Sequence, residues 1–209
     1  MKQEEHLSAD ELFDYCLKEY DSNNKLVKKL FDNFFSKIED VVKNIPQNAR
    51  ILEVGCGAAE SSRRLFKMLK NQHFEASEYD ERYVTKLSTI NLPFIITQES
   101  VYEMRREDNS FDCIFLLEVL EHLEFPEKAK KELCRVSRKN VVISVPNEPI
   151  WKFSNILRGK YIRFGGNTPG HINHYSVRSL SKFFSTHFNI IKIYKPFPWL
   201  IIILEKKLQ

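Results

Sequence analysis

One run of sequence limits the fold of this chain more than any other: ILEVGCGAAE, at residues 51–60. Its first four residues predict a short apolar strand, Gly55 and Gly57 predict a tight turn, and the residues that follow predict the start of a helix. Because glycine has no Cβ, such a turn lets a nucleotide-like ligand come close to the backbone. An ordinary strand-to-helix turn that binds nothing is the alternative interpretation.

The charges around the turn indicate which nucleotide it accepts. A dinucleotide-binding turn needs a third glycine, at the position that Glu60 occupies here, so that the pyrophosphate can rest on the start of the helix. Glu53 and Glu60 would both repel a pyrophosphate. S-adenosylmethionine (SAM) has no phosphate and carries a sulfonium and an ammonium group, so acidic neighbours suit it. The turn therefore predicts a SAM site, and a dehydrogenase is the least favoured interpretation.

These residues resemble the first motif of the class I SAM-dependent methyltransferases, which is an acidic residue followed by x-Gly-x-Gly-x-Gly. Glu53, Gly55 and Gly57 match this motif, and Ala59 stands where the third glycine usually falls. The resemblance implies a Rossmann-like fold, with SAM held by the three matching residues. It also implies that the chain is an enzyme that transfers the SAM methyl group to an acceptor.

A second segment lies at the distance that this fold requires. Residues 74–78 predict a strand, which ends in Glu78-Tyr79-Asp80. In doubly wound folds an acidic residue about 20 positions after the glycine turn binds the ribose hydroxyls, and a carboxylate offers two acceptor oxygens to these two donors. We therefore expect Glu78 to bind the ribose, with Asp80 as the second choice, and Tyr79 to lie along the adenine. A solvated strand end is the alternative.

A third segment, residues 99–112, resembles the adenine-contacting loop of the same family and the start of its fourth strand. Ser100 stands where that family often has an aspartate, so the carboxylate contact to the adenine amino group is lost. We expect Ser100 and Val101 to contact the cofactor through a hydroxyl and the backbone, with Glu99 as an alternative adenine contact.

Strands and helices alternate along the middle of the chain. This rhythm predicts a parallel sheet with helices on both faces. Two further strands near the end resemble the family's terminal hairpin, which places the last strand antiparallel. We therefore expect an α/β, Rossmann-like, doubly wound sheet of seven strands, mostly parallel, with an N-terminal helical cap. The expected strands lie near residues 51–54, 74–78, 94–98, 111–117, 140–145, 188–194 and 199–205.

We expect one methyltransferase domain over residues 1–209. Within it, residues 1–46 form the helical cap and residues 47–147 form the SAM-binding core. Residues 148–209 form an insert on the substrate side and the C-terminal hairpin. From Trp151 to Phe164, aromatic residues alternate with lysine and arginine, which predicts a lid over an acidic or lipid-linked acceptor. A packed crossover with a solvated basic face is the alternative.

The chemistry is expected at the carboxyl ends of the strands. A helix beginning after the fourth strand would place Glu118, Glu121 and His122 on one face, at i, i+3 and i+4. The segment resembles a Glu-Val-Leu-Glu-His-Leu run of small-molecule methyltransferases, including ubiquinone-pathway O-methyltransferases. That resemblance implies that Glu118 contacts the cofactor and that His122 accepts a proton from an acceptor hydroxyl. Glu121 and His174 are the other predicted catalytic groups.

Two alternatives concern the same residues. Their pattern also resembles the metal site of small-RNA 2′-O-methyltransferases, in which Glu118, Glu121, His122 and His174 would hold a divalent cation. The downstream segment lacks that family's fuller signature, so a metal cofactor is not favoured. A SAM-binding subunit without turnover is the second alternative. The histidines can also be structural, with His122 bonded to a carboxylate and His171 or His174 anchoring a loop to the backbone.

The composition and charge of the chain limit the classes of partner that it can bind and indicate where in the cell it works. The net charge is +4, and lysine and glutamate are interspersed, whereas nucleic-acid binders usually show a stronger basic stripe. No apolar run is long enough for a membrane span, and the first residues lack a signal-peptide core. The four cysteines have no metal-binding spacing, which is typical of a reduced, cytoplasmic protein. We therefore expect methyl transfer to an oxygen, less readily a nitrogen or carbon, of a small-molecule acceptor.

Overall fold

A computed structural model describes residues 8–11, 13–14, 24–148, 150 and 171–208 of the chain. The expected lid from Trp151 to Phe164 lies outside the described residues, as does Cys16. The other three cysteines, Cys56, Cys113 and Cys134, are free and buried.

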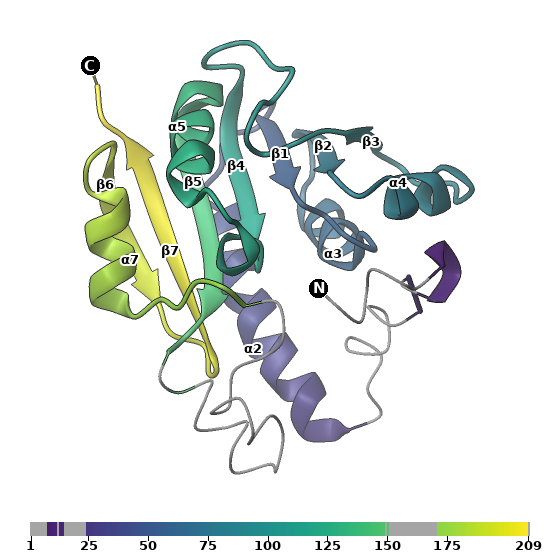
Figure 1. The fold of residues 1–209 in the computed structure, drawn as a ribbon, viewed down its shortest axis with the longest axis horizontal. Coiled ribbons are helices and arrows are strands. Elements are labelled where there is room, and N and C mark those ends of the chain that lie inside the picture. The colour runs from purple at the N-terminus through teal and green to yellow at the C-terminus, as the bar shows by residue number, and fades with distance from the viewer. Residues whose placement is uncertain (1–7, 12, 15–23, 149, 151–170, 209) are drawn as a thin grey trace.

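A seven-stranded sheet forms the centre of the molecule, in the order β3-β2-β1-β4-β5-β7-β6. The strands β1 to β5 pair in parallel, and β7 lies between β5 and β6, antiparallel to both (Figure 1). The expected sheet with its antiparallel last strand is therefore confirmed. The strands are β1 Arg50–Val54, β2 His73–Glu78, β3 Ile95–Gln98, β4 Phe111–Leu117, β5 Ser137–Pro146, β6 Phe188–Tyr194 and β7 Trp199–Lys206.

Helices cover both faces of this sheet, as the alternation predicts. The helices are α2 Lys25–Val42, α3 Glu60–Met68, α4 Glu81–Ser88, α5 Pro126–Val136 and α7 Val177–Phe184, with a short 3₁₀ helix η1 at Leu120–His122. In Figure 1, α5 and α7 lie in front of the sheet and α2 lies behind it. Two buried apolar clusters result, one including α5 and α7 and the other including α2, α3 and α4.

The N-terminal helix α2 packs on the last strand. Asn24 caps the helix by accepting a hydrogen bond from the Leu26 amide at 2.9 Å. The rings of Phe31 and Phe34 lie 5.2 and 5.1 Å from the ring of Trp199, which begins β7. This contact confirms a helix at the N-terminal side of the domain. Among the described residues, no helix is long and apolar enough to cross a membrane.

The parallel strands β1 and β4 are neighbours at the middle of the sheet, with Glu53 in register with Phe115. The chain leaves β1 toward β2 on one side and leaves β4 toward β5 on the other, so the strand order reverses between them. Ligands of doubly wound sheets bind at the carboxyl ends of the strands at this reversal. The loops after β1, β2 and β4 therefore frame the expected site.

Candidate active site

The turn after β1 is held against the end of β2. The amides of Gly55 and Cys56 donate to the carbonyl oxygen of Ser77 at 2.8 and 3.0 Å. Gly55 has a φ of 75° and Gly57 a φ of 52°, in the left-handed region that favours glycine. Ala59, at the position of the family's third glycine, has a φ of 61°. Its backbone is therefore left-handed, which explains why glycine is usual at this position.

The two glycines differ in what surrounds them. A Cβ on Gly55 would lie 2.6 Å from Cγ2 of Val119, in the loop after β4, whereas a Cβ on Gly57 would meet nothing within 4 Å. Packing between the two loops therefore excludes a side chain at Gly55. The open space over Gly57 is where a ligand can approach the backbone.

Glu78 closes the same turn from β2. Its Oε2 accepts from the Gly57 amide at 2.7 Å, and its Oε1 accepts from the amides of Tyr79 and Asp80 at 2.7 and 2.9 Å. Burial raises the pKa of this carboxyl, and the three amides partly offset that rise. A carboxylate has about four acceptor positions, so one is left beside Gly57 for a ribose hydroxyl. Asp80, the second choice, instead caps α4 and pairs with Arg82 at 2.6 Å.

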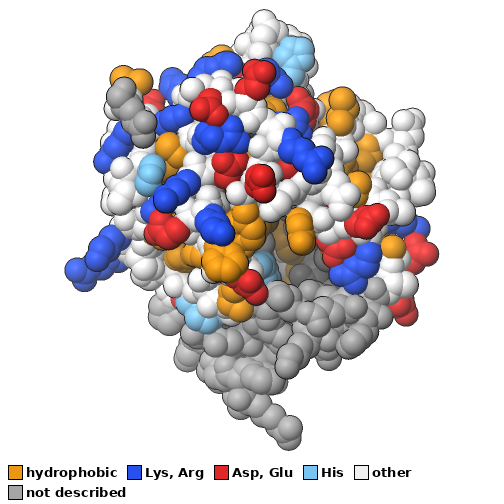
Figure 2. Space-filling model, turned by 45° about the horizontal axis from the view of Figure 1, so that its top comes forward, with side chains coloured by type: hydrophobic (Ala, Val, Ile, Leu, Met, Phe, Trp, Pro, Cys, Tyr) orange, Lys and Arg blue, Asp and Glu red, His pale blue; other side chains and the backbone are white. Residues whose placement is uncertain are grey.

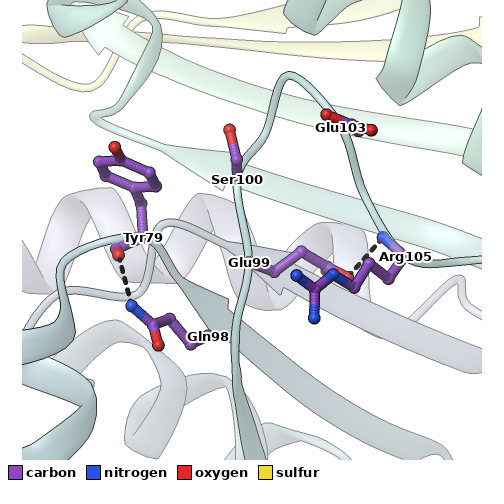
Figure 3. Close-up of a pocket in the computed structure, with 6 residues that line it drawn as sticks. All are labelled: Tyr79, Gln98, Glu99, Ser100, Glu103 and Arg105. Carbon is purple, nitrogen blue, oxygen red and sulfur yellow. Dashed lines mark hydrogen bonds between the residues drawn. The ribbon is translucent and has the colours of Figure 1, made fainter.

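A pocket of about 410 Å³ lies at the ends of β2 and β3 and is lined by Tyr79, the residue after Glu78. In Figure 3 the side chains of Tyr79 and Ser100 point to the same side of the pocket. Tyr79 is 73 % exposed, which leaves its ring free to lie against an adenine. The lining residues are Tyr79, Gln98, Glu99, Ser100, Glu103 and Arg105. Two predicted cofactor residues from separate loops therefore meet at one pocket.

The neighbouring residues hold this pocket in shape. Glu99 is buried and accepts from the Arg105 amide at 2.8 Å and from Nε of Arg106 at 3.2 Å, so its carboxylate fixes the loop. Its contact with an adenine, the alternative given above, stays a prediction. The Ser100 hydroxyl accepts from the Tyr102 amide at 3.2 Å and keeps its own hydrogen to donate. The Val101 side chain is buried in the core, which leaves its backbone as the group for a ligand.

Glu53 of β1 is buried inside the protein. Its side chain is only 1 % exposed and its carboxylate accepts a hydrogen bond from the Ser62 hydroxyl of α3. Burial raises the pKa of Glu53 to about 7, although Ser61 and Ser62 act in the opposite direction. Glu53 therefore supports the turn from inside the protein through Ser62, and its expected contact with the cofactor stays a prediction.

The chain leaves β4 in a way that the sequence did not predict. Glu118 has a left-handed φ of 57°, which no residue of an α-helix adopts, and the turn that follows is the 3₁₀ helix η1. The expected helical face of Glu118, Glu121 and His122 is therefore wrong. Ser144 of β5 fixes the bend, because its hydroxyl accepts from the Glu118 amide at 3.0 Å and donates to Oε1 of the same residue at 2.7 Å.

Glu121 points into the protein while its neighbour His122 is exposed. Glu121 is 1 % exposed, and neither of its carboxylate oxygens has a hydrogen-bond partner among the described residues. Burial, together with the nearby charge of Glu118, raises the pKa of Glu121 well above its usual range. Its backbone carbonyl accepts from the amides of Ile172 and Asn173, both at 3.0 Å, so the segment from residue 171 onward lies on η1.

That segment brings in a histidine that the sequence did not favour. The rings of His122 and His171 lie 4.9 Å apart, edge to face, and ligand atoms of Glu121, His122 and His171 all lie within 4.8 Å of one another. Burial and the charges of His122 and His174 lower the pKa of His171 to about 4, so its ring is neutral at neutral pH. His174 is not in this group: its Nδ1 lies 3.4 Å from Oε1 of Glu148.

Comparisons with known proteins agree with this architecture. Residues 26–189 match the family model described as a methyltransferase domain. No curated protein sequence matches the chain. Among solved structures, a SAM-dependent methyltransferase from Aquifex aeolicus is similar at 17 % identity and a TM-score of 0.69, over 91 % of this chain and 97 % of that one.

Two further structures have the same fold. Magnesium protoporphyrin IX methyltransferase from Synechocystis PCC 6803, solved with bound S-adenosylhomocysteine (SAH), is 16 % identical with a TM-score of 0.66, over 93 % of this chain and 94 % of that one. The third structure is a complex between the Haloferax volcanii methyltransferase activator Trm112 and a methyltransferase. A chain of this complex is 10 % identical with a TM-score of 0.67, over 87 % of the present chain and 93 % of that chain. At sequence identities of 10 to 17 %, these similarities show that the proteins share a fold, and they do not identify a substrate.

Proposed function

Because this chain belongs to the methyltransferase domain family, as a class I SAM-dependent methyltransferase, we propose that it methylates an oxygen of a small-molecule or lipid-linked acceptor. The observation that carries the proposal is the group that Glu121 and His122, after β4, form with His171, after β5. An acceptor hydroxyl has to lose its proton as it attacks the methyl group, and these side chains can assist that loss. We also expect the protein in the cytoplasm, which stays a prediction.

The proposed placement of SAM follows the strand ends. The adenine lies in the pocket beside Tyr79 and Ser100, and a ribose hydroxyl donates to Glu78. The methionine part then crosses the open space over Gly57 toward the loop after β4. Because Val119 of that loop touches Gly55, the methyl group would be delivered beside Glu118 and η1.

The reaction forms a carbon–oxygen bond, breaks the carbon–sulfur bond of the sulfonium, and leaves SAH. The acceptor proton goes to the imidazole of His122, which is exposed and next to the buried Glu121. His174, paired with Glu148, is a second imidazole near His171 that can pass the proton to solvent. The protein otherwise contributes the alignment of the acceptor oxygen with the methyl group.

A small molecule is favoured over RNA as the acceptor. On the face drawn in Figure 2, basic and acidic side chains are intermixed and form no continuous basic area. RNA binding relies on neutralising phosphates with such an area. The name of one structural neighbour, magnesium protoporphyrin IX methyltransferase, is that of an enzyme for a small molecule, which also supports this choice.

The remaining alternative is a SAM-binding subunit without turnover, and one structural neighbour was solved with an activator protein. An acceptor screen with methyl-labelled SAM distinguishes an active oxygen methyltransferase from a subunit without turnover. We expect label in phenolic, carboxylic or lipid-linked hydroxyl acceptors, and a loss of at least tenfold in rate with His122→Ala. The control is His187→Ala, whose ring contacts only the neighbouring Thr186 hydroxyl among the contacts described. SAH binding without transfer to any acceptor pool would contradict the proposal.

A further inference from the structure

We propose that Glu121, His122 and His171 together bind one divalent transition-metal cation of the zinc or cobalt type. Two imidazole nitrogens and one carboxylate oxygen are the ligands that these ions accept, whereas magnesium and calcium prefer oxygen alone. The ligand set differs from the one that the sequence suggested. The binding of an ion is inferred from the geometry and burial of these side chains. Only the consequence of that binding for catalysis rests on the function proposed above.

The geometry suits a single ion. The ligand atoms of the three residues lie within 4.8 Å of one another. Ligands at about 2.1 Å from a tetrahedral ion are about 3.4 Å apart. Side-chain rotations that bring the ligand atoms closer by up to about 1.4 Å would therefore complete the site.

The buried carboxylate is the second, independent observation. Glu121 is 1 % exposed, and both of its oxygens lack hydrogen-bond partners among the residues that the structure describes. Buried polar groups in folded proteins are almost always paired, because an unpaired one loses its hydration without compensation. A cation held between Glu121 and the two imidazoles supplies the missing partner.

The backbone around the site is fixed by contacts that need no ion. The Glu121 carbonyl accepts from the amides of Ile172 and Asn173. The side-chain amide of Asn173 donates to the carbonyls of Leu123 at 2.6 Å and Leu120 at 3.4 Å. These bonds join the segment carrying His171 to both ends of η1. The backbone that carries the ligands is therefore positioned before the ion arrives, which lowers the entropy cost of binding it.

The residues of the alternative ligand set are engaged elsewhere. Glu118 accepts from the Ser144 hydroxyl, and His174 lies against Glu148. Three protein ligands leave a coordination position open, as in catalytic zinc sites. An acceptor hydroxyl bound there would release its proton to solvent more readily. His122 would act as a ligand in the ion-bound protein, so the proton acceptance assigned to it above belongs to the ion-free protein.

The test is binding of Co²⁺ and Zn²⁺ to the full chain after treatment with a chelator, in the absence of SAM and acceptor. We expect one cation per chain by calorimetry, and visible Co²⁺ absorption bands of a site with fewer than six ligands. Glu121→Gln and His171→Ala should each weaken binding at least tenfold. His174→Ala and His187→Ala, the matched controls, should leave it unchanged. SAH binding by each variant verifies that it is folded.

Absence of one-to-one binding to the wild type would overturn the proposal. So would binding that survives His171→Ala and is lost with His174→Ala, because that result would assign the ion to the other ligand set. Failure of the proposed acceptor chemistry is distinguishable, since it would leave metal binding intact while no oxygen acceptor becomes labelled.

Discussion

The Cβ position of Gly55 lies 2.6 Å from Cγ2 of Val119, so the loop after β1 and the loop after β4 fit together only while residue 55 has no side chain. One loop carries the cofactor turn and the other leads directly to Glu121 and His122. This contact fixes how closely the two loops approach each other, and it gives the two glycines of the turn different expected mutational effects.

Gly55→Ala should destabilise the protein more than Gly57→Ala. Both substitutions put a side chain at a left-handed φ, which costs about 1 kcal/mol. Only the first also forces Val119 to move, with a further cost of about 1–3 kcal/mol for overpacking. Urea unfolding of both variants measures the difference.

Gly57→Ala should affect ligand binding more than stability. Its methyl group would enter open space in the ligand-free protein, so SAH affinity falls while the unfolding free energy changes by about 1 kcal/mol. Calorimetric titration with SAH provides the second measurement. Equal losses of stability in the two variants would show that the Val119 contact is unimportant.

Glu78→Ala should weaken SAH binding about 100-fold, because a charged acceptor for the ribose is lost together with the anchor of the Gly57 amide. Glu78→Gln should retain part of the affinity, since its amide oxygen can still accept one hydrogen bond. Asp80→Asn is the control, as Asp80 is engaged with Arg82. A stronger effect of Asp80→Asn than of Glu78→Ala would reverse the assignment of the ribose ligand.

Glu53 should make stability fall as the pH rises. Its pKa of about 7 in the folded protein is above the unfolded value of 4.5. Its protonated form therefore favours the folded state below pH 4.5, and this contribution is lost as the pH rises through about 7. Relative to the wild type, Glu53→Gln should gain on the order of 2 kcal/mol between pH 5 and pH 8. Urea titrations at both pH values test this, and a difference that stays constant with pH would contradict it.

Asn173→Ala should reduce methyl transfer without weakening SAH binding. The substitution removes two hydrogen bonds that hold His171 against η1, at a cost of about 1–2 kcal/mol in stability. Because Asn173 holds the segment that carries His171, we expect the rate at saturating SAM to fall while the Michaelis constant for SAM stays the same. An unchanged rate would mean that the position of His171 does not matter for transfer.

Much of the fold could be predicted because it follows from local patterns. Short apolar runs, with residues at helical spacing between them, predicted β1 to β5 close to their observed bounds. The two expected strands at residues 188–194 and 199–205 predicted the C-terminal hairpin. The glycine turn could be placed because its residue types are required by backbone conformation at those positions.

The parts of the site that sequence reasoning missed depend on contacts between distant segments. The backbone of Glu118 is left-handed, and two hydrogen bonds to Ser144 of β5 hold it in that conformation. The i, i+4 spacing of residues in the sequence cannot predict this contact with a distant strand. His171, and not His174, lies beside Glu121 and His122 because the amides after His171 reach the Glu121 carbonyl. Both histidines stand in the same short motif, so only the three-dimensional register distinguishes them. Glu53 faces inward because Ser62 of α3 lies below the turn.

The packing of α2 on Trp199 has a consequence for biosynthesis. Phe31 and Phe34 leave the ribosome long before β7 has been made, and their partner belongs to a strand that most of the chain separates from them. Such contacts between distant segments slow folding. The Phe31 and Phe34 rings therefore lack their Trp199 partner during synthesis until β7 completes the sheet, and apolar surface left uncovered at that stage is what chaperones bind.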